Sequence, residues 1–155
     1  MNPRDFFVVA KKLSDINDPA HCRSAISRAY YAVYNQAVGI LEQWGFEIER
    51  GPSGHKEVQY RLLYSNDKGA QVIRRQLMDL EGDRVKADYR LDQAAIEGQQ
   101  TAQSKVLQVE KMMAELEAAR TDGVRSGRMY DSIKKNEQRI ESMLREYRQR
   151  IAGDR

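Results

Sequence analysis

The chain has 155 residues, of which 41% are hydrophobic and 32% are charged, and its formal net charge is +3. This size and mixture predict one domain with one core and favour a helical protein over a disordered chain. No apolar run approaches the roughly 18 residues that a membrane helix needs, and the N-terminus does not resemble a signal peptide. The single cysteine, Cys22, excludes an intramolecular disulfide and a Cys-based metal cluster. We therefore expect a cytoplasmic protein that does not bind membranes.

The positive charge is concentrated at the C-terminal end. Residues 1–119 hold 16 Lys and Arg against 17 Asp and Glu, whereas residues 120–155 hold 10 against 6. Such a surplus favours binding of nucleic acid or of an acidic partner. It is also typical of an ordinary solvent-exposed helix face. We expect a helical bundle over residues 1–119 and a basic C-terminal helix over residues 120–155, packed on the bundle or on a partner.

Two helices are predicted before the first loop. Asn2-Pro3 and Asp18-Pro19 each combine a capping side chain with a proline in the first turn. After the second of these signals, apolar residues keep a three-four spacing from Cys22 to Trp44, about seven helical turns. The sequence Gly51-Pro52-Ser53-Gly54 is then an unambiguous loop.

The remaining segments also have helical periodicity. We expect a helix from about His55 to Tyr64, a short helix around Val72–Leu80, and a linker or turn over Glu81–Arg90. Two further helices are expected, from Leu91 to about Ala119 and from about Tyr130 to Ile151. The apolar stripe of the last helix is narrow, which suits either packing on its own bundle or pairing with another chain. The fold class is all-α, an up-down bundle of five to six helices.

The most informative segment is residues 27–37, with the sequence Ser-Arg-Ala-Tyr-Tyr-Ala-Val-Tyr-Asn-Gln-Ala. Buried tyrosines and arginines need polar partners, so Leu and Ile would build a core more cheaply. We expect Arg28 to be buried among these tyrosines. Arg28, Tyr30, Tyr31 and Ala32 resemble the S-R-x-Y-Y-A signature of HEPN-domain proteins, which are small all-helical prokaryotic proteins often paired with a nucleotidyltransferase.

The resemblance continues along residues 1–119. His55 matches a histidine that many members have at the start of the next helix, and residues 84–89 are similar to an R-x-x-A-D-Y element, with Arg84, Asp88 and Tyr89 in place. This resemblance implies a HEPN-like bundle, a homodimer and a partner of the nucleotidyltransferase type.

These residues suggest one polar network. Asp88 can pair with Arg84 or Arg28, and tyrosine hydroxyls can complete the set, because a buried arginine needs a carboxylate or several acceptors. The network is either a clamp that holds the Asp88 segment on the second helix or a phosphate or nucleotide pocket in which Arg binds and Tyr stacks. The candidate binding residues are Arg28, Tyr30, Tyr31, Arg84, Asp88 and Tyr89.

HEPN nucleases, by the same resemblance, use an arginine followed after four to six residues by a histidine. Of the two histidines, only His55 has such an arginine, Arg50, before it. The spacer here is a Gly/Pro loop rather than a helix, so His55 is either a general acid or base with Arg50 as phosphate ligand, or a helix-start residue bonded to the network. Two distant histidines and one cysteine give no metal-ligand spacing, and no nucleotide-cofactor glycine motif is present, so neither a metal nor a cofactor is expected.

Three functions remain open at this point. The first is an RNA-binding, nucleotide-binding or partner-binding module of a toxin–antitoxin or defence system. The second is a metal-independent endoribonuclease toxin whose site forms at a dimer interface. The third is a helical protein–protein adaptor whose basic tail binds a partner. The absence of a helical Arg…His motif favours the first.

Overall fold

The computed structural model describes residues 2–154, and every regular element in that range is a helix. The all-α expectation is confirmed, but the described residues form seven α-helices rather than five or six, with one short 3₁₀ turn. The elements are α1 (Pro3–Ser14), α2 (Pro19–Gln43), α3 (Pro52–Leu63), α4 (Lys68–Tyr89), η1 (Ala94–Ile96), α5 (Gln99–Thr121), α6 (Gly123–Lys135) and α7 (Glu137–Gly153).

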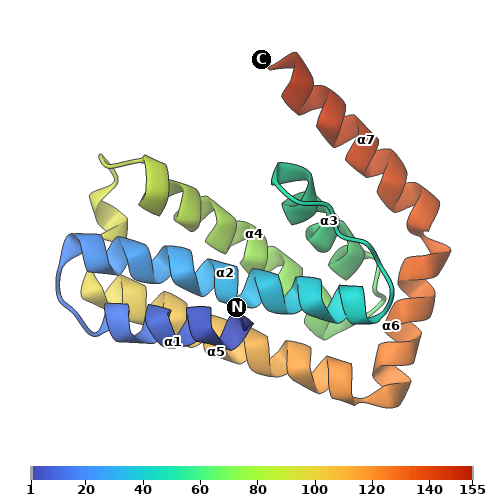
Figure 1. Ribbon diagram of the computed structural model, residues 1–155, viewed down its shortest axis with the longest axis horizontal. Coiled ribbons are helices and arrows are strands. Elements are labelled where there is room, and N and C mark those ends of the chain that lie inside the picture. Colours follow the sequence, from blue (N-terminus) through green and yellow to red (C-terminus); the bar gives the residue numbers. More distant parts are fainter. Residues whose placement is uncertain (1, 155) are drawn as a thin grey trace.

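Helix α2 is the centre of the bundle. It runs beside α1 and α5 and packs against α4 on another flank (Figure 1). Helix α6 turns away at the end of α5, and α7 then packs along α3. The segment after residue 119 therefore folds back onto the first part of the chain.

The local sequence explains why α2 is long and buried. The Asp18 side chain accepts a hydrogen bond from the His21 backbone N–H at 3.0 Å, and Pro19 occupies the first turn. At 25 residues α2 is the longest helix of the first hundred residues, and Ile26 and Val33 are fully buried. The long second helix that the apolar spacing predicts is therefore confirmed.

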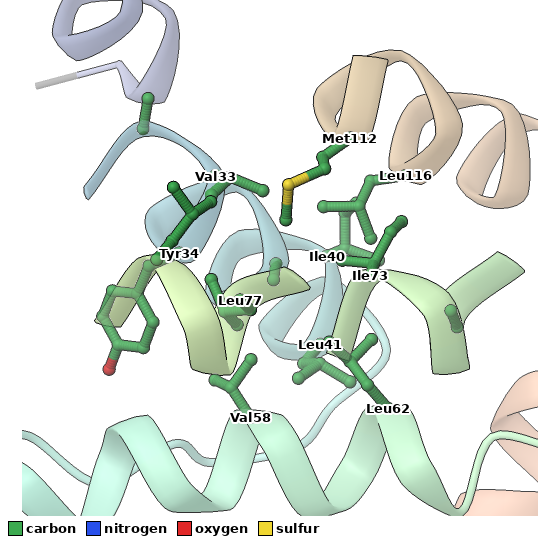
Figure 2. Packing of buried hydrophobic residues seen from close by; sticks show 14 of the residues in the cluster. Val33, Tyr34, Ile40, Leu41, Val58, Leu62, Ile73, Leu77, Met112 and Leu116 are labelled. Atoms are coloured by element: carbon green, nitrogen blue, oxygen red, sulfur yellow. The ribbon is translucent and has the colours of Figure 1, made fainter. Parts of the chain in front are cut away.

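The hydrophobic core is shared by nearly the whole molecule. Figure 2 shows α2 residues such as Val33 and Leu41 packed against Leu77 of α4 and Met112 of α5. The C-terminal segment adds four fully buried side chains to the same cluster, which are Met129, Ile133, Ile140 and Leu144. Their burial fixes α6 and α7 to the bundle by the same apolar packing that holds the other helices.

The linker expected over Glu81–Arg90 is wrong, because α4 continues without a break to Tyr89. Gly82 suggested an interruption, yet Leu80 and Ala87 continue the buried stripe on either side of it. Tertiary burial therefore outweighs the low helix propensity of one glycine, about 1 kcal/mol. As a consequence Asp88 lies in the last turn of a helix and not in a loop.

Other boundaries also differ from expectation. The helix expected from Leu91 begins at Gln99, after the 3₁₀ turn, and the expected last helix is two helices separated at Asn136. Asn136 donates from its side chain to the carbonyl of Ser132 at 2.8 Å, which competes with continuation of the helix.

Arg23 fastens the end of α4 to α2. It is 8% exposed and donates to Glu97 from Nε at 2.9 Å and from Nη2 at 2.7 Å. Its Nη1 donates to the carbonyls of Lys86 and Arg90 at 3.0 and 3.1 Å. Each of these carbonyls also accepts a backbone N–H, so Arg23 adds to the bonds that close the helix end. Arg23 thereby fixes the turn of α4 that carries Asp88 and Tyr89.

Candidate functional site

A group of aromatic and charged side chains gathers where α2, α3 and α4 meet. We call it the tyrosine–histidine cluster, and it consists of Tyr30, Tyr31, Tyr34, His55 and Arg84. Tyr30, Tyr31 and Tyr34 are three, four and seven residues after Ser27, which places all four on one side of α2. Figure 2 shows Tyr34 at the edge of the core with its hydroxyl directed away from Leu77. The cluster thus borders the core rather than filling it.

The loop before α3 places His55 against these rings. Gly51 has a φ of 83°, a conformation that side chains rarely adopt, and a Cβ on Gly54 would collide with the Glu49 carbonyl. The loop expected over Gly51–Gly54 is wrong from Pro52 onward, because α3 begins there, and His55 lies in its first turn. Its ring stacks on Tyr34 with centroids 4.3 Å apart, and Nδ1 lies 2.5 Å from the Tyr30 hydroxyl.

The electrostatic surroundings keep His55 and its tyrosine neighbours neutral. Burial lowers the pKa of His55 below its ordinary value, and burial together with the Glu81 carboxylate raises the pKa of Tyr30. Burial, with the nearby Glu57 carboxylate as the next cause, raises the pKa of Tyr34 to about 12. At neutral pH the cluster therefore holds an uncharged imidazole and protonated phenols.

The hydrogen bond between Tyr30 and His55 selects one tautomer of the imidazole. Tyr30 is fully buried, and His55 is its one hydrogen-bond partner among residues 2–154. The phenol must donate to satisfy its proton, so Nδ1 accepts and Nε2 carries the imidazole hydrogen. Nε2 makes no hydrogen bond to the described part of the chain. It is a donor available to another molecule.

The donors of Arg84 are unused, in contrast to those of the structural arginine Arg23. Its side chain is 12% exposed, and its guanidinium lies 5.6, 5.8 and 6.0 Å from the rings of Tyr30, Tyr31 and Tyr89. Within the described residues it makes no hydrogen bond, its buried Nε has no partner, and its one ion pair, with Asp88, is long at 3.8 Å. Such an arginine retains its capacity for bidentate binding of an anion.

The predicted network is partly correct. Asp88 pairs with Arg84 as expected, and it accepts a hydrogen bond from Ser27 Oγ at 3.1 Å. The expectation that Arg28 is buried and joins Asp88 is wrong. Arg28 is exposed and its guanidinium lies 6.0 Å from the Phe6 ring. Ser27 faces α4, and the next residue of a helix points about 100° away from it.

Helices α3, α4 and α7 supply a polar border that the sequence did not reveal. Glu81 accepts a hydrogen bond from Gln59 Nε2 at 2.7 Å and pairs with Lys56 at 3.6 Å. The Lys56 ammonium lies 5.9 Å from the ring of Tyr147 on α7. Tyr34 was recognisable from its spacing to Tyr30, whereas Glu81 was hidden because its segment was interpreted as a linker.

Arg50 lies in the exposed loop before α3. Its positive charge acts on Tyr34, where it opposes the rise in the pKa of the phenol. No hydrogen bond or ion pair joins Arg50 to His55 in residues 2–154. The spacing of the pair along the chain is therefore not accompanied by a direct contact.

Part of the positive charge of the basic tail is paired within the protein. Lys134 pairs with Glu137 at 3.2 Å, and Arg148 pairs with Glu141 at 3.1 Å. Arg139 lies 5.6 Å from the ring of Tyr64, so it too is committed to a protein contact. The surplus of positive charge does not form one uninterrupted basic face.

Comparison with known proteins gives no match to a family model, a curated protein or a solved structure. None of the described helices has the length and apolar character needed to cross a bilayer. Residues 2–154 also contain no group of three or more His, Cys, Asp or Glu placed to hold a metal ion. The chemistry of the site is accordingly argued from its own geometry.

Proposed function

We propose that this protein is a HEPN-like module that binds RNA or a nucleotide through the tyrosine–histidine cluster. In this proposal it acts in a toxin–antitoxin or defence system with a partner of the nucleotidyltransferase type. The single observation that carries the binding function is Arg84, whose guanidinium makes no hydrogen bond to residues 2–154 although aromatic rings enclose it. The proposed role in a toxin–antitoxin or defence system rests on the resemblance to the HEPN pattern. The residues that carry this resemblance are Arg28, Tyr30, Tyr31, His55, Arg84, Asp88 and Tyr89.

A phosphate group suits the unused donors. The Arg84 guanidinium offers bidentate contacts, and the Nε2–H of His55 offers a neutral donor. Tyr89 is 71% exposed and lies beside Arg84, so its ring can stack on a base. Asp88 holds the guanidinium only at 3.8 Å, so a phosphate oxygen competes with it readily.

Metal-independent RNA cleavage is the second candidate, favoured by a neutral histidine close to an arginine. A general base needs an unprotonated nitrogen that faces the substrate, and Tyr30 occupies Nδ1. His55 would have to exchange tautomers before Nε2 accepts a proton. This requirement, and the absence of a direct contact with Arg50, make binding the better supported function.

Binding is tested by fluorescence anisotropy with a labelled single-stranded RNA at several salt concentrations. Arg84→Gln should weaken binding by about tenfold or more, since a hydrogen bond to a charged group contributes about 1.5–3 kcal/mol. Arg4→Gln, which removes an exposed arginine from α1, is the matched control and should leave affinity nearly unchanged. Equal affinity of wild type and Arg84→Gln would exclude this site.

Cleavage is tested in the same protein preparations. The labelled RNA is incubated in chelator with wild type, His55→Ala and Arg50→Ala. Loss of cleavage by about 10²–10⁴-fold in His55→Ala would establish the catalytic role of His55 and the nuclease function. Intact RNA with all three proteins, combined with the loss of affinity in Arg84→Gln, is the result that the binding function requires.

A further inference from the structure

A cleft lies where the start of α1 meets α2 and α5. Helix α1 begins partway along the other two helices, which both continue beyond its first residue (Figure 1). The cleft has a volume of about 520 Å³, which is in the range of small-molecule sites. It shares no residue with the tyrosine–histidine cluster, so the proposed RNA binding leaves it without a role.

The walls of this cleft carry unpaired charges of opposite sign. Arg4 of α1 and Glu110 of α5 both line it. Both side chains are exposed, and neither forms an ion pair within residues 2–154. Glu117, the other carboxylate of the cleft, is already paired with Arg120. A ligand with a single charge meets one attractive and one repulsive group here, whereas a zwitterion is attracted by both.

The side chain of Gln36 adds a buried acceptor to the lining. Its Nε2 donates to the carbonyl of Met113 at 3.1 Å, which fixes the orientation of the amide. Its Oε1 is buried and has no hydrogen-bond partner in the described part of the chain. A buried acceptor without a donor is rare because it costs free energy. A ligand with an N–H donor supplies the missing bond.

The remaining lining is largely apolar. Phe7 of α1 and Met113 of α5 both line the cleft, and both are half-buried against the main core, which holds them in place. A flexible thioether adapts to ligands of different shape, and contact with these side chains removes apolar ligand surface from water. The cleft therefore favours a ligand that combines two opposite charges with an aliphatic group.

We propose that this cleft binds a free α-amino acid with an aliphatic side chain. The ligand carboxylate binds the Arg4 guanidinium, and its ammonium donates to Glu110 and to Gln36 Oε1. The aliphatic side chain packs on Phe7 and Met113. This inference goes beyond the proposed RNA binding and does not depend on it. A ligand of about nine non-hydrogen atoms in an open cleft should have a dissociation constant on the order of 1 mM.

Binding is tested with L-leucine, followed by backbone amide shifts in NMR spectra of isotope-labelled protein up to about 20 mM ligand. We expect saturable shifts in the first turns of α1 and at residues 110–117. Isopentylamine, isocaproate and glycine lack the carboxylate, the ammonium and the side chain of leucine, respectively. Each should bind about tenfold more weakly or less. Absence of saturable shifts with leucine, or equal binding by any of the three analogues, overturns the proposal.

Two variants assign the charged contacts. Arg4→Gln and Glu110→Gln should each weaken leucine binding by about tenfold. Arg4→Gln should leave isopentylamine binding unchanged, because that ligand has no carboxylate, and Glu110→Gln should not weaken isocaproate. Arg75→Gln and Glu146→Gln are the matched controls, since both residues are exposed and form no ion pair among residues 2–154.

The two proposed sites are separated by the same proteins. Arg4→Gln should lose leucine binding and keep its RNA affinity, whereas Arg84→Gln should do the reverse. Circular dichroism establishes that each variant remains helical. Leucine affinity that survives Arg4→Gln or Glu110→Gln, with helicity intact, excludes an amino-acid site in this cleft, whatever the outcome of the RNA experiment.

Discussion

At the scale of single residues, His55 makes the free energy of unfolding depend on pH. The folded protein holds His55 neutral, because burial lowers its pKa below the ordinary value of 6.5. The unfolded chain therefore takes up a proton first as the pH falls, and the free energy of unfolding decreases on acidification below about pH 6.5. Protonation also turns Nδ1 into a donor, which removes the acceptor for the buried Tyr30 hydroxyl.

We predict that the stability of the wild type falls between pH 7 and pH 5 and that His55→Gln reduces this dependence. Urea unfolding at pH 5, 6 and 7 measures the effect. The His55 ring protons, followed by NMR, should titrate below pH 6.5. A midpoint above 6.5 would show that the imidazolium and not the imidazole is the favoured form in the folded cluster.

A second residue-scale prediction compares two ion pairs of different burial. Asp88 is 30% exposed, so Asp88→Asn should lower the free energy of unfolding by about 1 kcal/mol or less. Glu57 is 4% exposed and pairs with Arg61 at 2.7 Å, so Glu57→Gln leaves a buried guanidinium without its carboxylate and should cost about 3–5 kcal/mol. Urea unfolding midpoints measure both, and equal losses would contradict the assigned difference in burial.

At the scale of elements, the last turn of α4 depends on a side chain from α2. Arg23 binds carbonyls at the end of this helix, so its loss removes these bonds and leaves the Glu97 carboxylate without its arginine. We predict that Arg23→Met, which keeps the aliphatic volume, lowers stability by about 3–5 kcal/mol. Amide hydrogen exchange should rise at residues 86–90 more than in α1. Unchanged exchange there would show that α4 ends independently of α2.

The sequence predicted the elements that a single apolar stripe defines. The spacing from Cys22 to Trp44 was sufficient to find α2 and its burial, since that periodicity follows directly from contact with a core. Local spacing did not predict structure where a helix depends on a side chain that is distant along the chain. The final turn of α4 requires Arg23, more than sixty residues earlier, and no local pattern contains that information.

The candidate site, like the fold, could be predicted only in part from the sequence. Arg84, Asp88 and the tyrosines were identified by their chemistry, because buried phenols and guanidinium groups need partners. Arg28 was misplaced since adjacent helical residues face different directions, and only the register of α2 against α4 shows that Ser27 makes the contact. Glu81 was missed because its segment was interpreted as a linker, and its partners Gln59 and Lys56 lie on α3.

At the scale of the whole molecule, one ion cluster ties α6 to the turn between α3 and α4. Arg125 binds Asp67 through two hydrogen bonds of 2.8 Å, and Asp67 also caps α4 by accepting from the Ala70 N–H at 2.9 Å. The Arg125 guanidinium lowers the pKa of Asp67 below its ordinary value of 3.8. This contribution is present above about pH 4 and is lost as the pH falls further.

We predict that Arg125→Met, which removes this interaction, makes the unfolding free energy less sensitive to pH between 4 and 2 than in the wild type. The unfolding free energy changes less with pH because the pKa of Asp67 in the folded variant lies closer to its pKa in the unfolded chain. Thermal unfolding at pH 4, 3 and 2 measures it. Arg75→Met, at an exposed arginine that forms no ion pair within residues 2–154, is the control for loss of a surface charge. Parallel slopes in all three proteins would exclude Asp67 as the titrating group.

A second, smaller cluster of buried residues, separate from the main core, contains the one thiol of the chain. The reactivity of this thiol reports whether the helices around it have separated. Cys22 is fully buried, and its neighbours come from α2, α4, η1 and α5, namely Ala25, Ile26, Ala87, Ile96 and Ala102. A thiol reagent reaches the sulfur only after these helices separate. A partial opening of this end exposes little surface to solvent, whereas complete unfolding exposes much more. The dependence of the labelling rate on denaturant concentration therefore distinguishes the two. Because the reagent reacts with the native thiol, no mutation is required to time that opening.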